Sequence, residues 1–289
     1  MTLIAQRVSA SIVSAFVDER GGGNAAGVVL CETEFSEAQM QAIAADIALS
    51  ETAFVRKREG GFAVDFFTPT TRIPDCGHAT IAAFGLLAQR GLLSGNTTKF
   101  TINGPRAIHF EGDTVFMQQP PPRYSFIADY AAILAAIGAD ESSLVTLPTI
   151  ARHDVGFIIV ALTNAASLAG LQPNMPGITS VTNAHGVIGI YVTAPGAGEF
   201  DKTTRMFAPA YGIPEEAATG MAGGLLAAYL HDCAAIVRDR YAFEQGACMS
   251  PPSPSRIVAY LVTERDRIRE VWVGGRAEVL EQRELRVLL

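Results

Sequence analysis

The sequence predicts an α+β fold of two lobes related by a pseudo-twofold axis, each lobe a curved, mostly antiparallel sheet wrapped around a central helix. Two observations lead to this prediction. One stretch of the chain recurs about 140 residues later, and both copies run from a β-rich segment through a Pro-containing loop into an apolar helix. The length of 289 residues also suits two ordinary domains better than one.

The repeat is most specific in its loop. Residues 67–90 read FTPTTRIPDCGHATIAAFGLLAQR, and residues 207–230 read FAPAYGIPEEAATGMAGGLLAAYL. Matches between two Ala- and Leu-rich helices arise easily by chance. A shared Phe, Pro and Ile-Pro at fixed spacing, followed by an acidic residue, does not. We therefore interpret the repeat as an internal duplication.

The two copied helices, expected at about 77–89 and 217–230, are apolar nearly all round, which is typical of buried helices. A further helix is predicted at 36–48, where Ser36 and Gln39 form a capping-box pattern, and another at 130–138. Short β-rich segments bounded by Gly, Asn and Pro are predicted to be strands. They lie at 7–17, 62–67, 97–103, 106–110, 114–118, 187–193, 204–207, 255–262 and 268–273.

The boundary between the lobes is predicted where residues 119–124 read QPPPRY, because this run breaks both helix and strand. The first lobe is then 1–118, with a C-terminal strand at 277–289 as a candidate addition to it. The second lobe is 119–276.

The composition argues for a small-molecule partner. The chain is 49% apolar and 18% charged, with a net charge of −7 and no basic stripe, so neither nucleic acid nor a membrane is expected as a partner. No apolar run approaches the ~20 residues of a membrane span, and the N-terminus lacks the pattern of a signal peptide. Four cysteines without a CxxC pair are typical of reduced thiols in a cytoplasmic protein.

The copied loops, 75–80 and 215–220, are candidates for a binding site. The start of a helix presents unpaired backbone amides and partial positive charge, which suit a carboxylate. If the lobes pack about the pseudo-twofold axis, both helix starts face one cleft, where a carboxylate-bearing substrate could bind.

Glu51 is the candidate proton-transfer residue. It stands between the predicted helix at 36–48 and an apolar strand, where a solvated charge is not expected. A half-buried carboxyl group there would have a raised pKa and would exchange protons near neutral pH.

Five segments together resemble the phenazine-biosynthesis isomerase-like (PhzF-like) family, which has the diaminopimelate epimerase-like fold. They are GNAAGVVL at 23–30, SETAFV at 50–55, FFTP at 66–69 with CGHAT at 76–80, RMFAP at 205–209 with EEAATGMA at 215–222, and QG at 245–246. They occur in order from Gly23 to Gly246 and so cover most of the chain.

The resemblance implies that Glu51 is the general acid/base and that His78 and Glu216 position or polarise the substrate. It implies substrate contacts from the residues around the two helix starts, with backbone amides of the glycines near the substrate carboxylate. These residues are Asn24, Cys76, Gly77, Ala79, Thr219, Gly220 and Met221. The resemblance also implies a reaction without cofactor or metal, and a homodimer.

The chain departs from the family pattern at the second loop. Glu216 and Ala217 stand where the family has Asp-Pro, and Met221 stands where it has Ser. The missing hydroxyl removes a hydrogen bond worth ~1 kcal/mol in a dry site. These changes leave the predicted role of Glu51 intact but argue against the phenazine precursor itself as the substrate.

Two alternatives stay open at this point. One is a racemase or epimerase of the same fold in which Cys76 and Glu216, paired by the repeat, act on opposite faces of the substrate. The other is a non-catalytic protein that binds small carboxylates. Phosphate-loop, HExxH and GxGxxG motifs are absent, and the five histidines lack metal-ligand spacing.

Overall fold

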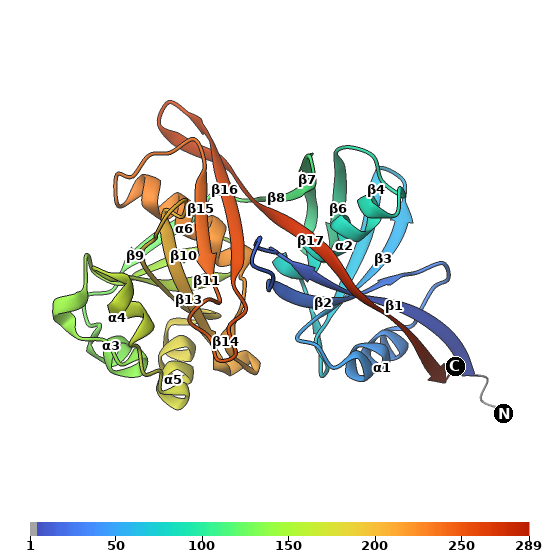
Figure 1. Cartoon of the computed structure of the whole chain (residues 1–289), viewed down its shortest axis with the longest axis horizontal. Helices are drawn as coiled ribbons and strands as arrows, with labels where there is room; N and C mark the ends of the chain where they lie inside the picture. Colours follow the sequence, from blue (N-terminus) through green and yellow to red (C-terminus); the bar gives the residue numbers. More distant parts are fainter. Residues whose placement is uncertain (1–4, 289) are drawn as a thin grey trace. The chain divides into compact units, whose positions relative to one another are not determined.

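The computed structural model describes residues 5–288 and divides into two compact units (Figure 1). Within the described residues, the first unit comprises 5–17, 24–118 and 274–288, and the second comprises 18–23 and 119–273. The chain returns from the second unit to the first within one long strand, β17 (Arg267–Leu288). Among residues 5–288, no helix is long and apolar enough to cross a bilayer.

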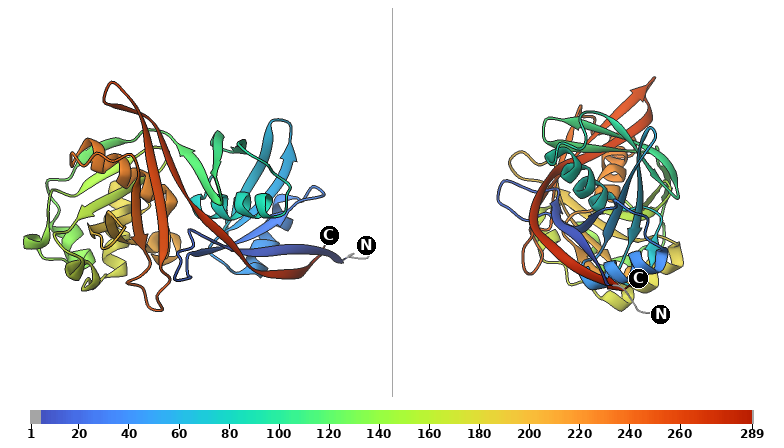
Figure 2. Two further views of the ribbon diagram at one scale, coloured as in Figure 1. Left: turned by 45° about the horizontal axis from the view of Figure 1, so that its top comes forward. Right: turned by 90° about the vertical axis from the view of Figure 1, so that its right-hand side faces the viewer.

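The strands of the first unit pair in a closed ring. The order is β1–β2–β3–β4–β6–β7–β8, and β17 closes it by pairing with both β8 and β1. The ring encloses the helix α2 (Gly77–Gln89), drawn in teal in Figure 2. The strand bounds are β1 (Ala5–Ala15), β2 (Asn24–Leu30), β3 (Thr52–Arg58), β4 (Gly61–Phe67), β6 (Thr97–Thr101), β7 (Gly104–Glu111) and β8 (Thr114–Gln119), and the short β5 (Arg72–Ile73) pairs with β4.

The second unit repeats the same pairing pattern. Antiparallel β10–β11, parallel β11–β12, antiparallel β12–β13, parallel β13–β15 and antiparallel β15–β16 follow in the order seen for β1–β2, β2–β3, β3–β4, β4–β6 and β6–β7. The bounds are β9 (Arg123–Phe126), β10 (Thr149–Arg152), β11 (Gly156–Ala161), β12 (Gly189–Pro195), β13 (Lys202–Ala208), β14 (Ile213–Glu216), β15 (Tyr241–Gln245) and β16 (Ser255–Glu264). The shared topology extends the duplication seen in the sequence to six strands of each unit.

Each unit has one copied helix in its core, as the apolar pattern predicts. In α2 every residue from Gly77 to Leu87 is buried. In α6 (Gly220–Asp232) every residue up to Leu230 except Met221 is buried. The predicted start of α6 at about 217 is wrong, because the preceding residues form β14 and a loop fixed by side-chain hydrogen bonds.

The other helices pack against the strands and form a further hydrophobic core cluster in each unit. The predicted helix at 36–48 is α1 (Glu37–Ile47), with the capping box of Ser36 and Gln39 formed. The predicted helix at 130–138 is α3 (Ala131–Ile137). Two helices of the second unit, α4 (Ala165–Ala169) and α5 (Met175–His185), were not predicted. The N-cap Asn174, which accepts a hydrogen bond from the amide of Gly177, is the pattern that could have revealed α5.

Gly85 of α2 permits close contact between the helix and β17. A Cβ atom at Gly85 would lie 2.4 Å from the Cβ of Ala277. We expect Gly85→Ala to destabilise the protein by about 1–3 kcal/mol, the usual cost of overpacking a core. The comparison is Gly177→Ala in α5, where the nearest atom would be 3.4 Å away and the helix gains about 1 kcal/mol of propensity. Equal thermal midpoints for the two variants would contradict this packing.

Candidate active site

Glu51 lies in the first unit, directly before β3. Its backbone carbonyl accepts a hydrogen bond of 3.0 Å from the amide of Gly27, where β2 and β3 pair in parallel. The first four residues of β3 are buried and all but Thr52 are apolar, so the strand enters the core immediately after Glu51. The Glu51 side chain is itself only 7% exposed. The sheet thus holds a carboxyl group in a place from which water is largely excluded.

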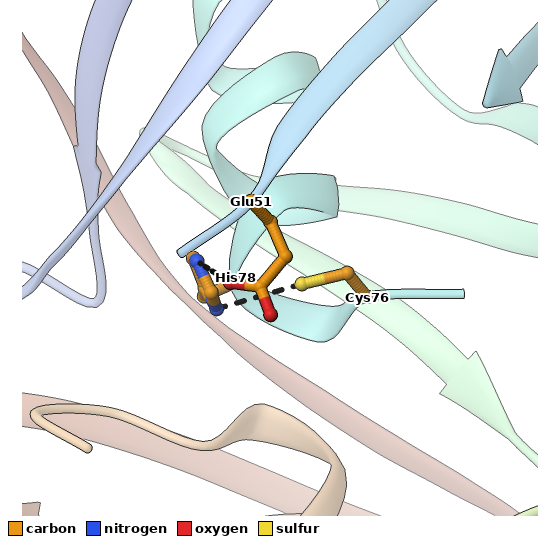
Figure 3. Close-up of side chains that lie close together, drawn as sticks. All are labelled: Glu51, Cys76 and His78. Carbon is orange, nitrogen blue, oxygen red and sulfur yellow. Dashed lines mark hydrogen bonds and ion pairs between the residues drawn. The ribbon is translucent and has the colours of Figure 1, made fainter. Parts of the chain in front are cut away.

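Cys76 and His78 stand at the start of α2 and face Glu51 (Figure 3). The Nε2 atom of His78 lies 3.2 Å from Oε2 of Glu51, and Nδ1 of the same ring lies 3.5 Å from Sγ of Cys76. Both side chains are at most 5% exposed. Three groups that carry protons therefore meet in one buried cluster, which we call the Glu51–Cys76–His78 cluster.

The surroundings of Cys76 oppose loss of the proton from its thiol. Burial raises the pKa of Cys76, and the negative charge of Glu51 raises it further, while His78 lowers it. At neutral pH the sulfur therefore carries its proton. A carboxyl group beside an imidazole is the better pair for accepting and returning a proton near pH 7.

A buried lysine holds the loop that carries Cys76 and His78. Lys99 of β6 is fully buried, and its Nζ donates to Oδ1 of Asp75 at 2.5 Å and to Oγ1 of Thr80 at 3.1 Å. The same Asp75 oxygen accepts from the amide of Cys76 at 2.7 Å, and the Thr80 hydroxyl donates to the carbonyl of Cys76 at 2.6 Å. Lys99 thereby fixes both ends of the first turn of α2.

In the second unit, Gln245 holds the corresponding loop by a different set of bonds. Its Nε2 donates to the carbonyl of Glu216 at 2.7 Å and to Oγ1 of Thr219 at 3.0 Å, and its Oε1 accepts from the amide of Thr219. The Thr219 hydroxyl donates to the Glu216 carboxylate at 2.6 Å. Ser255 donates to the carbonyl of Ala217 at 2.8 Å. These bonds explain why α6 starts only at Gly220.

An ion pair between Arg205 of β13 and Glu215 of β14 supports the segment that leads into the same loop. Nε and Nη2 of Arg205 each donate to a different carboxylate oxygen of Glu215 at 2.8 Å. Arg205 is 7% exposed, so this bidentate pair is shielded from water.

Of the predicted site residues, the structure brings together Glu51, Cys76 and His78, with Gly77 and Ala79 in the same helical turn. Asn24 is buried at the first residue of β2. In the second unit, Glu216 and Thr219 are bonded to each other and Gly220 and Met221 begin α6. Joint action of the two loops on one substrate stays a prediction.

Sequence reasoning missed Lys99 and Ser255 altogether. Gln245, Arg205 and Glu215 lie in segments that carry the family resemblance, but no role in holding the loop was predicted for them. The signal for Gln245 is the glycine that follows it, Gly246. A Cβ atom at Gly246 would lie 2.1 Å from the carbonyl oxygen of Ser253, and its φ is +77°. A glycine required at that point marks a tightly built segment.

The cluster also has the ligand types of a metal site. One atom from each of Glu51, Cys76 and His78 lies within 4.8 Å of the other two. Carboxylate oxygen, thiolate sulfur and imidazole nitrogen are the donors that zinc accepts in proteins.

Solved structures confirm the predicted diaminopimelate epimerase-like fold. The chain superposes on the PhzF-family phenazine biosynthesis protein of Bacillus anthracis with a TM-score of 0.86 at 23% identity, covering 97% of this chain and 99% of that one. It also matches a hydroxyproline epimerase from Agrobacterium vitis, solved with trans-4-OH-L-proline, with a TM-score of 0.60 at 13% identity, covering 98% and 93%. These likenesses define the chain as a protein of the diaminopimelate epimerase-like fold.

Within that fold class, the chain belongs to the phenazine biosynthesis-like (PhzF-like) family, whose sequence model matches residues 13–283. It is 33% identical over 284 residues to an uncharacterized isomerase of Deinococcus radiodurans, covering 92% of this chain and 91% of that one. It is 32% identical over 228 residues to trans-2,3-dihydro-3-hydroxyanthranilate isomerase of Pseudomonas aeruginosa, covering 76% and 78%. The resemblance predicted from the sequence is thus confirmed, and the chain is an isomerase of this family.

The four cysteines provide a test of the electrostatics. Burial raises the pKa of Cys31 to about 11 and also raises those of Cys76, Cys233 and Cys248. A disulfide reagent at pH 8 should therefore react far more slowly with the native protein than with the unfolded chain, because thiolates are the reactive form. A rapid reaction of one thiol, abolished by Cys76→Ala, would contradict the protonated Cys76.

The same raised pKa values predict how stability depends on pH. Thiols of the folded protein keep protons that thiols of the unfolded chain lose, so the free energy of unfolding should fall as the pH rises above about 9.

Proposed function

We propose that this chain is a cofactor-independent isomerase that moves a proton between two carbons of a small carboxylate-bearing substrate, with Glu51 as the general acid/base. The observation that supports this most directly is the burial of the Glu51 carboxyl group 3.2 Å from the His78 imidazole. A pair of this kind can accept a proton and return it without a metal or an organic cofactor.

In the proposed reaction, a carboxylate oxygen of Glu51 accepts the proton from one substrate carbon. The electrons of that C–H bond form a new double bond, an existing double bond opens, and Glu51 returns the proton to the carbon at its far end. Atoms and charge balance, as an isomerisation requires. His78 holds the carboxyl group in place and stabilises its charge during transfer.

The start of α2 is the proposed site for the substrate carboxylate. The backbone amides of its first turn lie next to the cluster, and the helix dipole adds partial positive charge there. Because Gly77 has no side chain, an anion can approach these amides closely.

The test is solvent exchange on a panel of small carboxylates. The panel includes trans-2,3-dihydro-3-hydroxyanthranilate, the substrate in the name of one relative, and trans-4-OH-L-proline, the ligand of one fold neighbour. Each compound is incubated with the protein in deuterated water and analysed by mass spectrometry and NMR. We expect deuterium at one carbon together with a shifted double bond for at least one unsaturated carboxylate. Tight binding of panel members without any exchange would instead support a binding protein.

The second candidate is an epimerase that uses Cys76 and Glu216 as base and acid. The position of Cys76 beside His78 favours it, since an imidazole can take the proton of a neighbouring thiol. The raised pKa of Cys76 argues against it. Inversion at a saturated carbon, with no shift of a double bond, would be the distinguishing product.

A further inference from the structure

We propose that the Glu51–Cys76–His78 cluster binds one Zn²⁺ ion, and that this ion reversibly inhibits the enzyme by occupying Glu51. The binding stands on the geometry of the cluster alone. The inhibition rests on the function proposed above, because it follows only if Glu51 moves the proton.

The donor set is specific for a borderline soft ion. Sulfur, nitrogen and carboxylate oxygen together suit Zn²⁺, whereas Mg²⁺ and Ca²⁺ prefer oxygen ligands alone. When Zn²⁺ binds, the Cys76 thiol gives its proton to solvent and a sulfur–zinc bond forms. The thiolate and the Glu51 carboxylate then carry two negative charges, which balance the ion, while His78 binds as neutral imidazole. The filled site has no net charge and is therefore compatible with its burial.

The distances fit a tetrahedral ion. Zinc–sulfur and zinc–nitrogen bonds of about 2.3 and 2.1 Å place the two ligand atoms about 3.6 Å apart in a tetrahedron. Sγ of Cys76 and Nδ1 of His78 are 3.5 Å apart. Figure 3 shows the Glu51 carboxyl group directed towards both side chains, and the three ligand atoms lie within 4.8 Å of one another. Glu51 now contacts Nε2 of His78, whereas Cys76 contacts Nδ1, so the Glu51 carboxyl group must leave Nε2 and turn to the Nδ1 side of the ring to complete three ligands.

The residues around the cluster hold its ligands in place, so the proposed zinc site is preorganised. Two of the ligands come from one helical turn that Lys99, Asp75 and Thr80 hold in place, and the third comes from the sheet. All three side chains are nearly buried, so little ordering remains to be done on binding. Three protein ligands leave a fourth position for water or a substrate carboxylate.

The test uses the whole protein, freed of metal with a chelator and titrated with ZnCl₂ by calorimetry. We expect one ion per chain, with at least a roughly hundredfold loss of affinity in Cys76→Ser and in His78→Ala, and at least a tenfold loss in Glu51→Gln. Cys31→Ser is the matched control and should bind zinc like the wild type, because Cys31 lies outside the cluster. MgCl₂ should give no binding.

A second measurement does not depend on any variant folding. Co²⁺ bound to the wild-type protein should show a thiolate-to-cobalt charge-transfer band in the near ultraviolet, as a sulfur ligand requires. Unchanged zinc affinity in a folded Cys76→Ser protein, a cobalt complex without that band, or no zinc binding would each overturn the proposal. These readouts need no substrate, so their failure is distinguishable from failure of the proposed isomerase activity.

If the binding is confirmed, Zn²⁺ should abolish deuterium exchange on the active panel compound, and a chelator should restore it. Full exchange with the site filled would overturn the inhibitory part of the proposal.

Discussion

Glu51→Gln is expected to lower the rate of solvent exchange by roughly a hundred- to ten-thousand-fold, the usual contribution of a general acid/base. Glutamine keeps the size and shape of the side chain but neither accepts nor returns a proton at neutral pH. Binding of the panel compound, followed by calorimetry, should change far less than the rate. A loss of transition-state stabilisation without a loss of binding is the kinetic pattern of a group that acts in the chemical step.

The matched control is Glu59→Gln. Glu59 lies at the exposed end of the hairpin that follows Glu51 along the chain, between β3 and β4. The same chemical change there should leave the exchange rate within twofold or so of the wild type, since surface substitutions seldom matter. An equal fall in both variants would show that Glu51 acts through the fold and not in the reaction.

Lys99→Met should destabilise the first unit by about 3 kcal/mol. This value is the lower end of the cost of breaking a buried ion pair. We take the lower end because the Asp75 side chain is 15% exposed, so water can partly solvate its carboxylate once Lys99 is lost. Methionine has similar length but donates no hydrogen bonds, so Asp75 and Thr80 both lose their partner. The first turn of α2 should then move, and exchange should slow even in protein that remains folded, because displacement of reacting groups by about 1 Å is costly.

Two comparisons separate this network from a general effect of charge. Lys57→Met removes an exposed lysine of β3 and should change stability by less than about 0.5 kcal/mol. The double variant Lys99→Met with Asp75→Asn should be less destabilised than the two single changes added together, since neither charge is left unpaired. Additive losses in that cycle would show that the two residues do not act as a pair.

The central helices could be predicted because local and global requirements agree there. In α2 an apolar surface on all sides, a Pro-containing loop before it and a glycine at its start all point to a buried helix beginning at Gly77. The start of α6 was misplaced because Gln245 and Ser255 hold residues 217–219 outside the helix. These bonds join positions up to 38 residues apart, and local pattern contains no trace of them.

The residue proposed to transfer the proton could be predicted from the sequence, but the side chains that hold the loops of the site could not. Glu51 stood out because a charged carboxyl group is not expected between a helix and an apolar strand unless it has a function. Lys99, in contrast, sits in the run TTKFT, where a lysine is normally taken to face solvent. Its burial depends on Asp75 and Thr80, which the chain brings to it only when β4 and β6 pair around α2.

The most direct test of Glu51 as the sole proton carrier compares two variants on one active panel compound. Deuterium incorporation by Glu51→Gln and by Cys76→Ala is followed by mass spectrometry under identical conditions. The account predicts loss of exchange in Glu51→Gln and a rate within about tenfold of the wild type in Cys76→Ala, since a thiol that only packs contributes little beyond a contact. Abolished exchange in Cys76→Ala with preserved exchange in Glu51→Gln would contradict it and assign the chemistry to Cys76.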